Sequence, residues 1–158
     1  VSKQVAVKRP DIIGKLLNRL LHNAEDSASS AWGALEATGA VISNSPDLFG
    51  EFSQPLLYFL KIRDFWKPVT WAIGKIATQR PDLVKYAVPA LCSFLGDPDP
   101  TLRGYAAWAL GGLGIPDVKE ELKKLETDNH LLFLYEEGNL KEKTVGQLAK
   151  EAIEKIDK

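Results

Sequence analysis

The sequence predicts an all-α solenoid of about four stacked helix pairs, with a small β-hairpin inserted in the last pair. The dipeptide Pro-Asp recurs at residues 10, 46, 81 and 116, at intervals of 36, 35 and 35 residues. A second apolar segment follows each of these dipeptides before the next one begins. A period of about 35 to 40 residues that contains two helical segments is typical of α-solenoids.

Each Pro-Asp predicts the start of a helix, because proline suits the first helical turn and an acidic side chain suits the positive end of the helix dipole. Apolar residues follow at helical spacing. In the first repeat these are Ile13, Leu16, Leu17, Leu20 and Leu21, and in the third they are Leu83, Ala87, Leu91, Phe94 and Leu95. The predicted repeats cover residues 10–45, 46–80, 81–115 and 116–158, within a single domain over 1–158.

The second half of each repeat contains another helical segment. The segments read SASSAWGALEATGAVI, FWKPVTWAIGKIA, TLRGYAAWALGGLG and TVGQLAKEAIEKI. They predict second helices near residues 27–43, 65–78, 100–113 and 145–157. A helix pair of this size cannot bury its apolar face alone, so neighbouring pairs must stack to form a continuous core.

The fourth repeat departs from a plain helix pair at residues 131–144. Its apolar run Leu131–Tyr135 is too short for a helix and leads into Glu-Glu-Gly-Asn, where Gly138 is available for positive φ. A β-hairpin is therefore expected, followed by a capping box from Thr144 to Gln147 that begins the last helix. Two roles stay open for the hairpin: it caps the end of the core, or its unpaired edge docks a partner.

The string GDPDPTLRGYAAWALGGLG, residues 96–114, closely resembles the HEAT-like repeat of the phycobilisome-lyase type. The resemblance is weaker for KIRDFWKPVTWAIGKIA and marginal for the first and last repeats. It implies the solenoid fold, whereas the family's members range from lyases to scaffolds. It also implies that Asp99 caps the second helix and that Arg103 holds the neighbouring turn, with an anion-binding arginine as the alternative. Repeat two has Trp66 where repeat three has Arg103.

Composition narrows the function classes. The net charge of 20 − 21 = −1 argues against a general nucleic-acid binder, although local basic patches remain open. No apolar run approaches the length of a membrane span, so no membrane contact is expected. The single Cys92 cannot form an internal disulfide, and the N-terminal VSKQVAVKRP lacks the apolar core of a signal peptide. A cytoplasmic protein is therefore expected.

The sequence contains no pattern typical of a catalytic, metal or cofactor site. His22 and His130 are the only histidines, and neither has a Cys or a second His at metal-ligand spacing. The His-Glu pairs of iron-binding repeat hydroxylases of the deoxyhypusine type are absent. Cys92 lies in an apolar helix beside Leu91 and is interpreted as a small core residue, not a nucleophile. We therefore expect no catalytic residue, no metal and no cofactor, and the sequence favours a protein that is not an enzyme.

The leading functional hypothesis is a noncatalytic scaffold that binds a protein partner on the concave face formed by the second helices. The first alternative is a nucleic-acid-binding enzyme of the HEAT-like DNA-alkylation-repair type, since that family places aromatic and basic residues on its concave face. The residues that superficially fit are Trp66, Lys67, Trp71 and Lys75. A bilin lyase or chaperone is a third hypothesis, which rests on the name of the repeat alone.

A row of tryptophans is the candidate binding surface. In the helix at 100–113, Trp108 lies far around from the apolar stripe that contains Leu102 and Leu110. Trp71 takes the same position in repeat two, and Trp32 belongs to the equivalent helix of repeat one. Exposed indoles would dominate binding energy. The predicted partner-binding residues are Trp32, Trp66, Lys67, Trp71, Lys75 and Trp108. The alternative is that adjacent second helices or the hairpin cover these rings.

Overall fold

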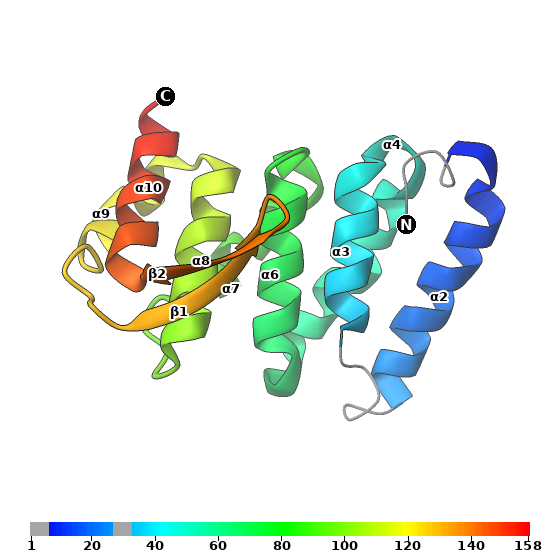
Figure 1. Ribbon diagram of the computed structural model, residues 1–158, viewed down its shortest axis with the longest axis horizontal. Helices are drawn as coiled ribbons and strands as arrows, with labels where there is room; N and C mark the ends of the chain where they lie inside the picture. Colours follow the sequence, from blue (N-terminus) through cyan, green and yellow to red (C-terminus); the bar gives the residue numbers. More distant parts are fainter. Residues whose placement is uncertain (1–6, 27–32) are drawn as a thin grey trace. The chain divides into compact units, whose positions relative to one another are not determined.

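The computed structural model describes residues 7–26 and 33–158, and it confirms an all-α fold with one β-hairpin near the C-terminus (Figure 1). The chain falls into two compact units, residues 1–84 and 85–158, and each is described by itself. A single repeat domain over 1–158 stays a prediction.

The first unit is built from helices α2, α3 and α6 and the short segments that connect them. α3 lies between α2 and α6 and packs against both (Figure 1). The elements are α2 (Pro10–Asp26), α3 (Ala34–Asn44), α4 (Pro46–Phe49), α5 (Ser53–Tyr58) and α6 (Trp66–Ala77), with 3₁₀ turns at Gly50–Phe52, Phe59–Lys61, Arg63–Phe65 and Pro81–Leu83.

The second unit is organised around helix α8. α7, α10 and strand β1 each pack against α8, and α9 packs against α10. The elements are a 3₁₀ turn at Lys85–Ala87, α7 (Val88–Phe94), α8 (Pro100–Leu113), a 3₁₀ turn at Pro116–Val118, α9 (Lys119–Lys123), β1 (Leu131–Glu136), β2 (Asn139–Thr144) and α10 (Val145–Asp157).

The predicted helix starts and second helices are confirmed. Each Pro-Asp begins a helical segment, α-helical at Pro10 and Pro46 and 3₁₀ at Pro81 and Pro116. α6, α8 and α10 agree with the predicted second helices to within a residue or so, and Asp99 Oδ1 caps α8 by accepting from the Thr101 backbone N–H at 2.8 Å. α3 begins at Ala34, and residues 27–32 of that prediction lie outside the described residues.

The first halves of repeats two to four are shorter and more broken than the helices that the sequence predicts. Repeat two divides after Phe49 and again after Phe52, and repeat three divides after Leu83. Pro55 and Pro89 each lie in the first turn of a new short helix, the part of a helix that tolerates a missing N–H. Apolar spacing thus predicted the buried residues better than it predicted helix continuity.

Two glycines set the closest helix contacts. A methyl group on Gly39 of α3 would lie 2.5 Å from the Cβ of Ala72 on α6. A methyl group on Gly111 of α8 would lie 2.7 Å from the Cα of Ala152 on α10. Both distances are too short for carbon atoms in contact. In each unit, therefore, two second helices approach at a point where one of them has no side chain.

The hairpin at residues 131–144 is confirmed. β1 and β2 are antiparallel, with Leu131 opposite Thr144 at the base and Glu136 opposite Asn139 beside the loop. The two loop residues, Glu137 and Gly138, have φ values of 52° and 78°, the pattern of a type I′ turn that matches the twist of a hairpin. The predicted capping box from Thr144 to Gln147 then begins α10.

Replacing Glu137 with asparagine should stabilise the hairpin by about 0.5–1 kcal/mol, because asparagine adopts positive φ at lower cost than glutamate. The exposed contact between Glu137 and Lys141, at 3.3 Å, offsets little of this gain. Amide hydrogen exchange in β1 and β2 measures the effect. Glu137→Gln is the matched control, since it removes the charge without favouring positive φ. Equal exchange rates in the two variants would contradict the expected gain.

Candidate functional site

The prediction of an exposed tryptophan ridge is wrong at the two positions where it was strongest. Trp71 is only 8% exposed and Trp108 only 4%. Trp108 shares its face of α8 with Gly104 and Gly111, which lie one turn to either side. A methyl group on Gly104 would lie 2.6 Å from a Leu132 methyl carbon of β1, and Gly111 contacts α10. The hairpin and α10 therefore cover this face, as the alternative interpretation required.

The other predicted partner-binding residues have different surroundings. Trp66 is half-buried, its indole N–H donates to the Leu60 carbonyl at 2.8 Å, and the Arg63 guanidinium lies 5.1 Å from its ring centre. Lys67 is exposed and Lys75 is half-buried. Trp32 lies outside the described residues. Contact of these residues with a partner stays a prediction.

The hairpin carries an exposed apolar surface that the sequence analysis did not single out. Leu132 and Leu134 point from β1 into the core of the second unit and are buried. The alternate residues of β1, which are Leu131, Phe133 and Tyr135, point the opposite way. The residues of β2 that lie directly opposite them share this face. We call this surface the outer face, and its residues are Leu131, Phe133, Tyr135, Leu140, Glu142 and Thr144.

Four side chains of the outer face are large, apolar and between 50% and 65% exposed: Leu131, Phe133, Tyr135 and Leu140. The signal in the sequence was the unbroken apolar run LLFLY. A strand with only one buried face alternates apolar and polar residues, so this run places apolar side chains on both faces. Contiguous exposed apolar surface is a common feature of interaction sites, so the outer face is a candidate site.

Arg103 forms a clamp between the start of α8 and the loop that precedes the hairpin. Its Nε donates to Asp128 Oδ2 at 2.9 Å, and its Nη1 donates to the Asp97 and Pro98 carbonyls at 2.8 and 3.0 Å. Its Nη2 lies 3.2 Å from His130 Nδ1. All three guanidinium nitrogens contact the protein, so the geometry supports the structural role that the resemblance implied.

The contacts of this clamp affect the pKa of the Asp128 carboxyl group. The side chains of Arg103 and Asp128 are 12% and 13% exposed. Burial acts to raise the pKa of Asp128, but hydrogen bonds from Arg103 and His130 outweigh it and bring the pKa below its ordinary value. The ionised carboxylate is therefore the form that the folded chain favours.

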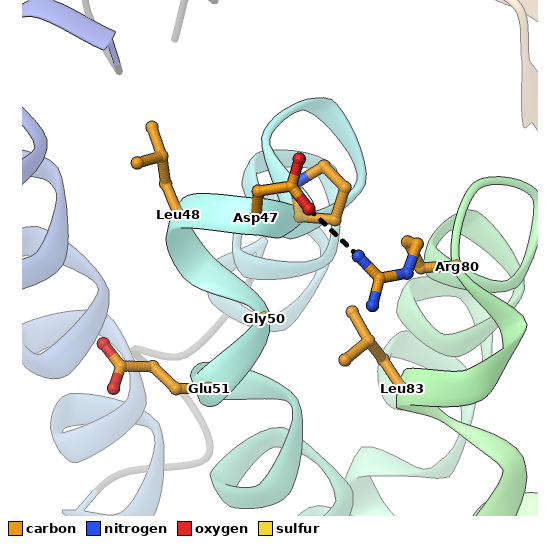
Figure 2. A pocket seen from close by; sticks show the side chains of 7 residues that line it. Asp47, Leu48, Gly50, Glu51, Arg80 and Leu83 are labelled. Atoms are coloured by element: carbon orange, nitrogen blue, oxygen red, sulfur yellow. Dashed lines mark hydrogen bonds and ion pairs between the residues drawn. The ribbon is translucent and has the colours of Figure 1, made fainter.

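A second arginine clamp lines an open pocket of about 440 Å³ in the first unit (Figure 2). Arg80 donates to both carboxylate oxygens of Asp82 at 2.9 Å and to Asp47 at 3.1 Å, so it links two successive Pro-Asp turns. Arg9 and Asp11 repeat the local contact at 3.4 Å. The signal in the sequence was RPD, an arginine two residues before the aspartate. The pocket lining is Pro46, Asp47, Leu48, Gly50, Glu51, Arg80 and Leu83.

The remaining reactive side chains are spread apart. Across residues 7–26 and 33–158, no three His, Cys, Asp or Glu side chains are grouped so as to hold a metal ion. Over the same residues, the helices are too short or too polar to cross a membrane. Cys92 is half-buried in α7, and burial, with the nearby charge of Glu121, raises the pKa of its thiol. The thiol is thus held in its less reactive, protonated form.

Comparison with known families agrees with this architecture. Residues 67–112 match the family model for the HEAT-like repeat, and residues 102–128 match that for the PBS lyase HEAT-like repeat. A search of the curated proteins found no match. The matched residues contain α7, α8, α9 and most of α6. Of these, α6 and α8 begin at residues 66 and 100, a spacing close to that of the Pro-Asp dipeptides. Residues 67–128 therefore consist of HEAT-like repeats.

Proposed function

We propose that the protein is a noncatalytic scaffold that binds a protein partner. The observation that carries this proposal is the outer face of the hairpin, where four large apolar side chains gather on one exposed surface. HEAT-like repeats fit an interaction role, and apolar surface of this kind favours association with another protein. The proposed binding surface thus lies on the inserted hairpin. The sequence had instead predicted it on the concave face formed by the second helices.

The alternative of a DNA-repair enzyme draws less support from the site. It relied on aromatic and basic residues of repeat two, but Trp71 is buried and the indole N–H of Trp66 already donates to Leu60. The proposed contribution of Lys67 and Lys75 to partner binding is independent of that enzyme activity. It is tested by measuring the Kd of the purified partner for Lys67→Ala and Lys75→Ala chains, which should bind more weakly than the unchanged protein if these lysines contact the partner.

The test is capture by the immobilised full chain from a lysate of its source organism, followed by reconstitution with the purified captured protein. A scaffold should form a complex of fixed stoichiometry with a Kd of about 1 μM or tighter at about 0.15 M salt. Two results would contradict the proposal. One is capture of nucleic acid alone, with affinity that falls steeply as salt rises. The other is a purified chain that carries the visible absorbance of a bilin.

A further inference from the structure

The outer face has a single charged group, and that group has no partner within the hairpin. Glu142 lies opposite Phe133, and its neighbours on the same face of β2 are Leu140 and Thr144. It is exposed, and no ion pair or side-chain hydrogen bond reaches it from the described part of the chain. Apolar side chains therefore flank one carboxylate that has no cation beside it.

The nearby lysines are already committed to other carboxylates. Lys141 lies 3.3 Å from Glu137 and 3.8 Å from Glu136, and Lys143 lies 2.8 Å from Glu151 of α10. Both lysines belong to the opposite face of β2, because side chains alternate along a strand. The cation that would neutralise Glu142 in a buried interface must come from the partner.

We infer that the outer face binds a protein segment in which a lysine or arginine is flanked by apolar side chains. This inference rests on the proposed scaffold function and specifies its partner. The apolar side chains around Glu142 would exclude water on binding, and a carboxylate left there without a cation would be costly. A basic side chain aimed at Glu142 removes that cost and fixes the register of the partner.

Charge also decides between this partner and two others. A symmetric second copy would present the same outer face, which has no basic residue to meet Glu142. An anionic membrane surface recruits clusters of lysine and arginine, which the outer face lacks. Self-association and vesicle binding are accordingly the competing outcomes of the test.

The experiment compares four immobilised full-length chains: the unchanged protein, Glu142→Lys, Phe133→Thr and Glu154→Lys. Glu154 is an exposed acid on α10, outside the hairpin, so its variant is the matched control for charge reversal. Captured proteins are quantified by mass spectrometry, and the most abundant one is purified for Kd measurement. Because Phe133 and Glu142 are exposed, all four chains should melt at similar temperatures by circular dichroism.

The expected result is a partner that binds the unchanged protein and Glu154→Lys equally, and the other two variants at least about tenfold more weakly. Cross-linking should map the contact to a partner segment with a Lys or Arg between apolar residues. Reversing that partner charge to Glu should restore binding to Glu142→Lys.

Three outcomes would overturn the inference. A partner that binds all four chains equally leaves the scaffold function standing and removes the outer face as its site. A second outcome is self-association in ultracentrifugation, or sedimentation with phosphatidylserine vesicles, that Phe133→Thr abolishes. The outer face would then bind a second copy of the chain or a membrane surface, and not a basic protein segment. A chain that captures no protein overturns both this inference and the proposed scaffold function.

Discussion

Replacing Gly39 or Gly111 with alanine should lower the free energy of unfolding by about 1–3 kcal/mol, because the added methyl group meets the backbone of a neighbouring helix. On Gly39 it would lie 2.7 Å from the Cα of Ala72, and on Gly111 2.7 Å from the Cα of Ala152. The helix pairs must separate to admit it, which loosens the surrounding core contacts. Urea denaturation monitored by circular dichroism measures the loss.

Gly14→Ala is the matched control for both substitutions. Gly14 also lies inside a helix, but its added methyl group would have Phe52 as its nearest neighbour at 3.9 Å, an ordinary contact. Alanine is a better helix former than glycine by about 1 kcal/mol, so this variant should be more stable than the unchanged protein. If all three variants gained stability, helix propensity would outweigh the close contacts and the packing argument would fail.

Arg103→Ala should destabilise the second unit by about 3 kcal/mol, since it leaves the largely buried Asp128 carboxylate without its cation. Arg103→Lys should recover only part of this loss, because one ammonium group cannot reach the positions that the three guanidinium nitrogens occupy. Arg80→Ala is the comparison: the Arg80 side chain is 38% exposed, and its loss should cost no more than about 1 kcal/mol. Equal losses for Arg80→Ala and Arg103→Ala would contradict the role of burial.

The Asp128 carboxylate should also make stability depend on acid pH. Because folding lowers its pKa below the ordinary value of 3.8, its contribution is fully present above that pH and is lost as the pH falls through the lower folded value. As the pH is lowered from about 5 to about 3, the free energy of unfolding should fall less in Asp128→Asn than in the unchanged protein. Parallel pH profiles for the two proteins would show that the clamp does not favour the ionised form.

The sequence predicted those parts of the fold that local chemistry determines. Proline in a first turn, the Thr144 capping box and a glycine at positive φ each act within a few residues, so they identify helix starts and the hairpin loop without knowledge of neighbours. The Asp99 cap is another such local signal. The periodic spacing of these signals was enough to predict helix pairs and their approximate bounds.

The candidate site depended on which element covers which face, and a single helix does not contain that information. The tryptophan row was expected to be exposed, but Gly104 and Gly111 beside Trp108 are the points where Leu132 and Ala152 come close. Small residues next to a large aromatic therefore indicated a covered face. The outer face of the hairpin was not predicted because an apolar run does not show which of its side chains stay exposed after the rest of the unit has packed.

The base of the hairpin affects the order in which the last repeat can fold. The His130 carbonyl accepts from the Val145 N–H at 3.0 Å, so the chain leaves the hairpin almost where it entered. A hairpin with a two-residue loop closes on a timescale of about 1–10 μs. The connection between α8 and α10 contains the hairpin. Once the hairpin has closed, residues 131–144 no longer add to the effective length of this connection, so less conformational entropy is lost when α10 docks on α8. We therefore expect the inserted strands to enlarge the surface of the repeat while adding little to the conformational entropy that is lost when its helices associate.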